Sequence, residues 1–344
     1  MATNMILGDV VLFEADESCI SRLICALSGS TVSHAAMYYD DVEKLIVEEA
    51  MPGIQLSPAP GGPTQERRVH LRRYKGDIDR SKLIAAAKDH LDKHEPYSMS
   101  NLVLIGVLLI FERFIKEKSY SRAVTIFFKI VCSLLANAIN EKKHPGKLPM
   151  TCSQLVSQCY TEAGYSLRFD NKLLSGRAVD NGEPSLADMV VEQLPELGLK
   201  GLAASDMTTW ADVTPNDMSF LEEILEPNNE ELPSSLLKGK SASSGAVLEK
   251  LCCFILGRLQ GEKQALWQAA EPSPELLEAT AYFSASVMQL EEPDAHVANS
   301  LSSKDNTIQN ILKLRNIFVS PGDLLDHCIS LADAGTIDPL KANG

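Results

Sequence analysis

The stretch that decides the fold is STVSHAAMYYD, residues 30–40. Its apolar run is typical of a buried β-strand, yet it contains the titratable ring of His34. A histidine in such a place is either a core residue hydrogen-bonded to a backbone carbonyl or one half of a catalytic pair. The second interpretation requires a partner elsewhere in the chain.

The elements predicted around this stretch mix strands with helices. Strands are predicted over residues 7–13, 32–39, 44–50 and 67–74, and helices over residues 18–29 and 80–94. Ser18 is the expected N-cap of the first helix, and Gly29 is expected to end it. The Pro- and Gly-rich residues 51–65 predict a loop. The mixture indicates an α+β fold.

Two apolar segments follow, residues 101–111 and 123–138. The first is too short to span a bilayer and runs into charged residues, and the second carries Lys129 in its middle. Buried helices are the preferred interpretation of both. A hydrophobic lid or a hairpin resting on a membrane is the alternative.

The charge of the chain disfavours two classes of partner. The formal net charge over 344 residues is -14. A nucleic-acid binder normally needs a basic face, and so does a protein that docks on an anionic membrane. Residues 1–9 lack the basic start of a secretory signal, so we expect a cytoplasmic protein without a stable membrane span. Delivery by a non-classical route stays open.

The eight cysteines show neither a CxxC pair nor the spacing of a zinc site. Most are expected to be reduced, buried and structural. We therefore expect no metal and no organic cofactor.

Cys152 differs from the others by its place in the pattern. The stretch TCSQLVSQCYTEAG, residues 151–164, predicts a helix in which Cys152 lies in the first turn and Gly164 ends the helix. Backbone N–H groups at a helix N-terminus favour thiolate over thiol and can stabilise an oxyanion. Cys159, on the same helix, represents the alternative of a structural cysteine.

A thiolate nucleophile requires an imidazole beside it, and the imidazole requires an orienting acceptor. His34 on one strand and an acid on the next strand can supply both. The acids available are Glu48 and Glu49, which must point to opposite faces of their strand.

The order of several short motifs resembles that of the circularly permuted papain-like hydrolases of the NlpC superfamily, in particular the YiiX/YaeF-like amidases. The motifs are Gly8-Asp9, Ser28-Gly29-Ser30, Ser33-His34, Val47-Glu48-Glu49-Ala50 with Gly53-Ile54, Glu95-Pro96-Tyr97-Ser98, Cys152-Ser153-Gln154-Leu155-Val156 and Val213-Thr214-Pro215. The resemblance covers roughly residues 7–220. Each motif is short, and their common order carries the resemblance.

The resemblance implies a barrel-like antiparallel sheet packed on helices and a set of site residues. Cys152 is then the nucleophile, His34 the general base and then acid, and Glu49, which precedes the alanine, the residue that orients His34. Tyr97 and Ser33 are weaker candidates for substrate binding. The implied substrate is a peptide or an acyl amide.

The expected domains are a hydrolase domain over residues 1–225, a linker over 226–245 and a helical extension over 246–344 that offers a surface for a protein partner. A cysteine amidase or peptidase is the first hypothesis. Alternatives are a lipid-handling acyltransferase or thioesterase of the same fold, action on a side-chain amide of another protein, and a non-catalytic interaction protein on a decayed hydrolase domain.

Overall fold

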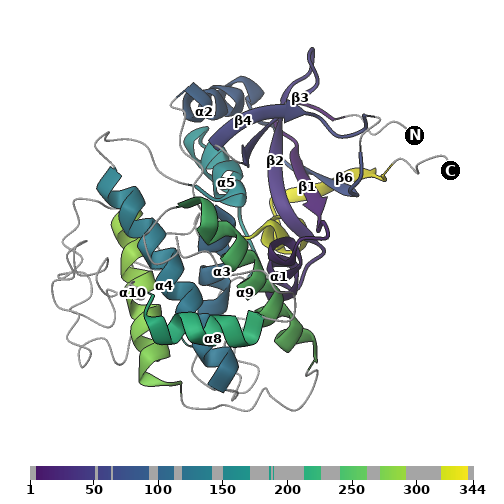
Figure 1. Ribbon diagram of the computed structural model, residues 1–344. Helices are drawn as coiled ribbons and strands as arrows, with labels where there is room; N and C mark the ends of the chain where they lie inside the picture. Colours follow the sequence, from purple (N-terminus) through teal and green to yellow (C-terminus); the bar gives the residue numbers. More distant parts are fainter. Residues whose placement is uncertain are drawn as a thin grey trace. The chain divides into compact units, whose positions relative to one another are not determined.

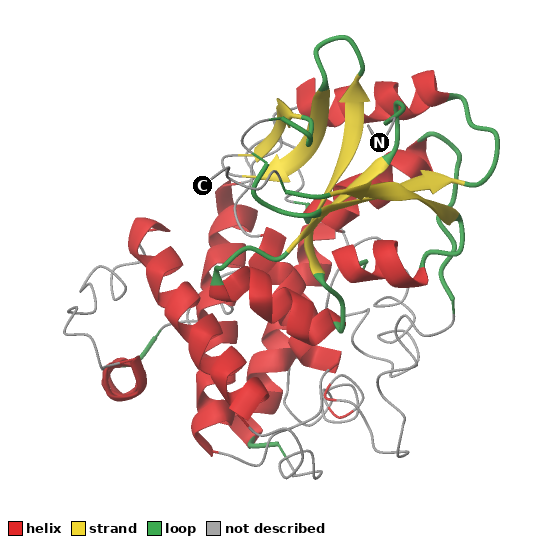
Figure 2. Cartoon of the chain, turned by 90° about the vertical axis from the view of Figure 1, so that its right-hand side faces the viewer, coloured by secondary structure: helices red, strands yellow, loops and turns green. Residues whose placement is uncertain are grey.

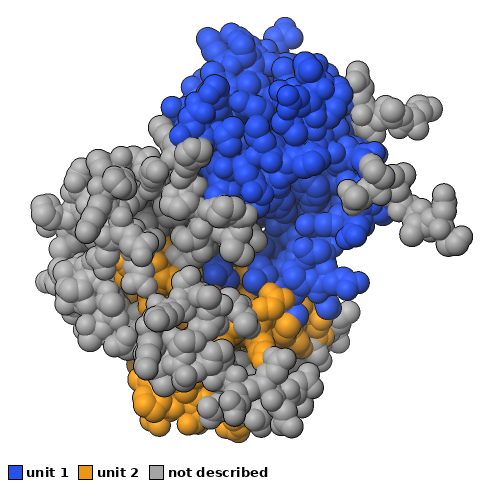
Figure 3. Space-filling view, turned by 45° about the horizontal axis from the view of Figure 1, so that its top comes forward, with its two compact units in different colours: residues 1–104, 146–176, 315–344 blue, residues 105–145, 177–314 orange. Residues whose placement is uncertain are grey.

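The computed structural model describes residues 5–50, 53–62, 65–92, 100–111, 118–141, 150–170, 186, 189, 213–225, 241–261, 272–291 and 319–339. The chain divides into two compact units (Figure 3). Unit 1 comprises residues 1–104, 146–176 and 315–344, and unit 2 comprises residues 105–145 and 177–314. The chain therefore leaves unit 1 and returns to it twice. The expected boundaries at residues 225 and 246 do not match this division.

Unit 1 contains an open sheet of six antiparallel strands in the order β4-β3-β2-β1-β5-β6. Figures 1 and 2 show this sheet from two sides. The strands are β1 (Val10–Glu14), β2 (Val32–Asp40), β3 (Leu45–Ala50), β4 (Gly53–Pro58), β5 (Val69–Tyr74) and β6 (Leu331–Ile337). The sheet and its helices confirm the α+β class.

The edge strand β4 corrects the expectation of a loop over residues 51–65. It pairs with β3 from Ala50↔Gly53 to Leu45↔Pro58. An edge strand tolerates a proline because one side of its backbone makes no ladder hydrogen bonds. Gly53 begins this strand and Pro58 ends it.

Three helices accompany the sheet of unit 1: α1 (Cys19–Ser28), α2 (Arg80–Asp92) and α5 (Cys152–Glu162). Helix α5 packs on β2 and β3, α2 packs on α5, and α1 packs on β2. The caps of α1 confirm the prediction, since Ser18 accepts from the backbone N–H of Ser21 and Gly29 adopts φ 66°.

The Gly8-Asp9 pair ties β1 to its neighbours. The carboxylate of Asp9 is fully buried and accepts two hydrogen bonds from Arg73 on β5, at 2.8 and 2.7 Å. The hydroxyl of Tyr160 on α5 donates to the carbonyl of Gly8 at 2.7 Å. A paired and hydrogen-bonded charge of this kind is costly to break, so the motif has a structural role in this chain.

The last described segment, residues 319–339, corrects the expectation of a helical extension to residue 344. It forms a short π-helix, η2 (Asp323–His327), and then β6, which pairs with β5 in the sheet of unit 1. The hydroxyl of Ser30 donates to Asp326 at 2.6 Å. This segment is therefore part of the sheet-containing unit.

Unit 2 contains helices α4 (Lys118–Glu141), α8 (Pro215–Leu225), α9 (Ser241–Gly261) and α10 (Pro274–Glu291), with most of α3 (Ser100–Phe111). Helices α9 and α10 pack on α4. The ring of Phe128 lies 5.1 Å from that of Phe283. The expectation of helices from residue 246 onward is confirmed for α9 and α10.

Helix α4 includes the apolar segment weighed above as a lid or membrane element. Residues Lys118–Ala136 are long and apolar enough to cross a membrane by those two criteria, but 67% of the apolar window is buried inside the protein. The core helix of a protein that spans no membrane can be equally long, apolar and buried, so α4 is weak evidence for a membrane span.

We predict that Gly322→Ala destabilises unit 1 by about 1–3 kcal/mol, because overpacking forces neighbours to shift. A Cβ at this position would lie 2.6 Å from the Cβ of Ser30. Gly62→Ala is the matched control, since nothing lies within 4 Å of its added Cβ. Thermal unfolding measures both variants, and equal stability of the two would contradict the close packing of residue 322.

Candidate active site

A bulge in β2 sets the position of His34. Phe13 pairs with His34 and the next residue, Glu14, pairs with Val32, so Ser33 is an extra residue in β2. A bulge bends its strand and re-aims the neighbouring side chains. Ser33 is 2% exposed, and its hydroxyl lies 2.5 Å from that of Ser21 on α1.

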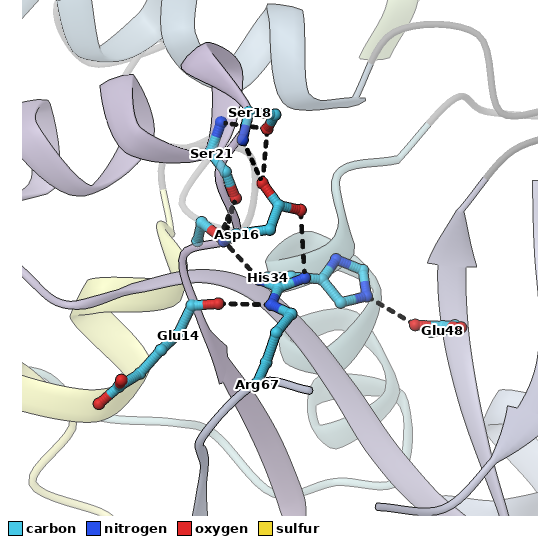
Figure 4. A network of polar contacts seen from close by, with 8 residues as sticks. Glu14, Asp16, Ser18, Ser21, His34, Glu48 and Arg67 are labelled. Atoms are coloured by element: carbon cyan, nitrogen blue, oxygen red, sulfur yellow. Dashed lines mark hydrogen bonds and ion pairs between the residues drawn. The ribbon is translucent and has the colours of Figure 1, made fainter. Parts of the chain in front are cut away.

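The ring of His34 pairs with Glu48, not with Glu49 (Figure 4). His34 Nε2 lies 2.7 Å from Glu48 Oε2, and the two side chains are 17% and 14% exposed. Ala36 pairs with Glu48 across β2 and β3, so His34, two residues earlier, is its diagonal neighbour on the same face.

The assignment of Glu49 as the orienting residue is therefore corrected. Side chains alternate along a strand, so Glu49 lies on the face opposite Glu48, together with Val47. Val47 packs in the core with Leu155 of α5, and Glu49 is 2% exposed. The position before the alanine does not decide which acid meets the histidine.

Helix α5 begins at Cys152 because Thr151 caps it. The Thr151 hydroxyl accepts from the backbone N–H of Gln154 at 3.0 Å, and the Gln154 side chain accepts from the N–H of Thr151 at 3.2 Å. This capping box fixes the helix start, as the sequence predicted for Cys152. The hydroxyl of Ser153 donates to the carbonyl of Val319, so the C-terminal segment also holds this turn.

Cys152 and His34 meet across α5 and β2. Burial raises the pKa of the fully buried Cys152, but the charge of His34 and a hydrogen bond with its ring outweigh burial. Backbone N–H groups of Ala35 and Ser153 also donate to the sulfur, and the net pKa of Cys152 is lowered.

The same contacts act on His34 in the opposite sense. Burial lowers its pKa, whereas the Cys152 thiolate and the Glu48 carboxylate raise it, to about 10 in total. Burial raises the pKa of Glu48, but hydrogen bonds with His34, Ser57 and Gln55 leave it lowered. Both shifts act in the same direction: they favour the thiolate form of Cys152 and the imidazolium form of His34.

This arrangement provides a nucleophile, a proton donor and an orienting carboxylate in one place. Among the described residues of unit 1, no three His, Cys, Asp or Glu side chains gather closely enough to hold a metal ion. A thiol, an imidazole and a carboxylate in this arrangement can support nucleophilic attack with proton transfer.

The structure describes only one of the two weaker candidates for substrate binding, Ser33 and Tyr97. Ser33 is buried and hydrogen-bonded, and it contributes to the bulge instead of lining an exposed surface. Tyr97 lies outside the described residues.

Sequence reasoning missed three side chains at the site. Gln55 and Ser57 hold Glu48 from β4, which was expected to be a loop. Arg67, just before β5, donates a hydrogen bond to Ser33. The alternation in GIQLSP, residues 53–58, was the available signal for the first two residues.

No protein-family model matches the chain, and a search of the curated proteins finds no match.

We predict that Glu48→Gln lowers the pKa of His34 by on the order of one unit or more, because the imidazolium loses its anionic partner. Glu49→Gln leaves that pKa unchanged, since the ring pairs with Glu48 and not with Glu49. NMR titration of the His34 ring, assigned with His34→Ala, measures both. The reverse order of effects would show that Glu49 orients the ring.

Proposed function

We propose that the chain is a cysteine hydrolase, an amidase or peptidase of the permuted papain-like class, in which Cys152 is the nucleophile. The observation that carries the proposal is the contact of Cys152, at the capped start of α5, with a His34 ring whose Nε2 lies 2.7 Å from Glu48. A strongly perturbed pair of titratable groups with a third orienting group is typical of nucleophilic sites.

In acylation, the Cys152 thiolate attacks the substrate carbonyl carbon and forms a carbon–sulfur bond. The His34 imidazolium then gives a proton to the leaving amine as the carbon–nitrogen bond breaks. Nε2–H points to Glu48, which leaves Nδ1 to exchange the proton. The carboxylate stabilises the imidazolium and keeps the ring in this orientation.

In deacylation, neutral His34 takes a proton from water, and the hydroxyl attacks the thioester carbon. The carbon–sulfur bond breaks, so the acid product leaves while thiolate and imidazolium are restored. The Cys152 side chain is 0% exposed, so entry of a substrate requires the groups that cover the sulfur to move.

The substrate class follows from the chemistry of the nucleophile and not from a described binding surface. Peptide amides and acyl amides are both accessible to a thiolate of this kind. The apolar segments that favoured an acyl group form helices α3 and α4, which are largely buried and belong mostly to unit 2, so they do not favour an acyltransferase or thioesterase over an amidase. A cytoplasmic location and a partner for the C-terminal helices stay predictions from the sequence.

The alternative of a non-catalytic interaction protein does not require Cys152 and His34 to be ionised. A binding module has no use for a buried thiolate paired with an imidazolium, because burying two charges is costly. The ion pair therefore supports a catalytic role for unit 1.

We predict that incubation with a panel of peptide amides, fatty-acyl amides and acyl esters gives a covalent acyl adduct on Cys152, detected by intact-mass and peptide mass spectrometry. Cys152→Ser removes the adduct, and His34→Ala slows turnover of any accepted substrate on the order of 10²–10⁴-fold. Cys159→Ala is the matched control, a second fully buried cysteine of α5, and retains turnover. An adduct on Cys159, or turnover that survives Cys152→Ser, would contradict the proposal.

A further inference from the structure

Arg67 is a charged side chain that the proposed chemistry does not use, although it reaches the bulge beside His34 (Figure 4). It precedes β5, and its side chain is 26% exposed. Its Nε donates to the carbonyl of Glu14 at 2.6 Å, and its Nη2 donates to the hydroxyl of Ser33 at 3.0 Å. Its Nη1 lies 3.6 Å from the carboxylate of Asp16. One guanidinium therefore joins the end of β1, the β1–α1 loop and β2.

The contact with Ser33 fixes the extra residue of the bulge. Ser33 Oγ also lies 2.5 Å from Ser21 Oγ, so this hydroxyl is held from two sides. His34 follows directly, and the direction of its side chain depends on the bulged backbone before it. Loss of the Arg67 hydrogen bond would leave a buried hydroxyl with one fewer partner at this point.

Arg67 also acts on His34 indirectly, because both residues contact the ring of Phe13. The guanidinium carbon of Arg67 lies 5.6 Å from the centre of the Phe13 ring, within the range of a cation–π contact. The Phe13 ring in turn lies 5.6 Å from the His34 ring, tilted by 44°. Phe13 and His34 are also paired across β1 and β2. Arg67 thus restricts a ring that packs against the imidazole.

The charges around the thiolate come from several elements. His34 and Glu48 face each other from β2 and β3, and Glu14 is engaged by His70 at 3.0 Å. The positive charge of Arg67 interacts favourably with the Cys152 thiolate and with Glu48, and also with Asp16 and Cys25. The positive charge of Arg67 therefore favours the ionised forms of Cys152 and Glu48, in addition to the contacts that Arg67 makes with Ser33 and Phe13.

We propose that Arg67 is a positioning residue for the candidate site: through Ser33 and Phe13 it holds the His34 ring against Cys152 and Glu48. The inference rests on the proposed function, because it assigns Arg67 to the thiolate–imidazolium pair. A planar guanidinium suits the role because it donates along fixed directions and stacks on an aromatic face, which an ammonium group does less well.

The test is the pH profile of the labelling rate of Cys152 by iodoacetamide, followed by mass spectrometry on folded full-length protein. Access to the buried sulfur sets the maximal rate, whereas the midpoint of the profile reports the pKa of the thiol. Arg67→Met is expected to raise the midpoint by on the order of one unit, which lowers the rate at about pH 6 roughly tenfold. Arg67→Lys keeps the charge and is expected to recover less than half of that shift.

Two further variants make the test specific. Arg68→Met changes the next residue, whose side chain is 50% exposed and pairs with Asp338, and it is expected to leave the midpoint unchanged. Ser33→Ala keeps Arg67 and removes one hydroxyl, so it remains informative if Arg67→Met does not fold. It is expected to shift the midpoint in the same direction by a smaller amount.

The outcomes separate this inference from the proposed function. A wild-type midpoint near that of free cysteine, about 8.5, would contradict both. A low wild-type midpoint that Arg67→Met and Ser33→Ala leave in place would overturn the role of Arg67 alone. Full recovery by Arg67→Lys would also overturn it, because charge without fixed geometry would then suffice.

Discussion

The pairing of Cys152 with His34, each of which shifts the pKa of the other toward its ionised form, is the interaction on which the site depends. A thiolate and an imidazolium are each costly to bury, and each becomes acceptable only because the other is present. Glu48 adds a negative charge at 2.7 Å from the ring, and the backbone N–H groups of Ala35 and Ser153 donate to the sulfur. Removing His34 would leave Cys152 and Glu48 without the cationic partner that favours their ionised forms.

Local features of unit 1 bring this pair together from distant parts of the chain. The bulge at Ser33 aims the histidine, and the capping box of Thr151 fixes the helix that carries the cysteine. The C-terminal segment holds the same helix turn through Val319 and extends the sheet with β6. Segments that are distant in sequence thus meet around the pair, as preorganised sites require.

The sequence predicted those helices and strands whose formation depends on residues close together in the chain. The helix of Cys152, the caps Ser18 and Gly29 and the strand of His34 all follow from residue periodicity and capping preference. The choice between Glu48 and Glu49 could not be made in this way. It depends on the pairing of Ala36 with Glu48, which is a register between two strands and is not encoded in either strand alone.

The parts that were missed depend on contacts between distant segments. Strand β6 lies in a part of the chain where the sequence predicted helices, and it becomes a strand by pairing with β5, more than 250 residues away. Strand β4 is rich in the residues that usually mark loops, but an edge position tolerates them. Arg67 sits beside Arg68 in the sequence, and only the fold shows that one reaches the bulge while the other pairs with Asp338.

The most direct test of the ion pair is the ultraviolet absorbance of the thiolate, which needs no access of a reagent to the buried sulfur. The measurement is the difference between wild-type protein and Cys152→Ala as the pH is varied, repeated on the His34→Ala background. The ion pair predicts a thiolate signal from Cys152 already at about pH 6 that disappears with His34→Ala. A signal that rises only near the pKa of free cysteine, about 8.5, with or without His34, would contradict it.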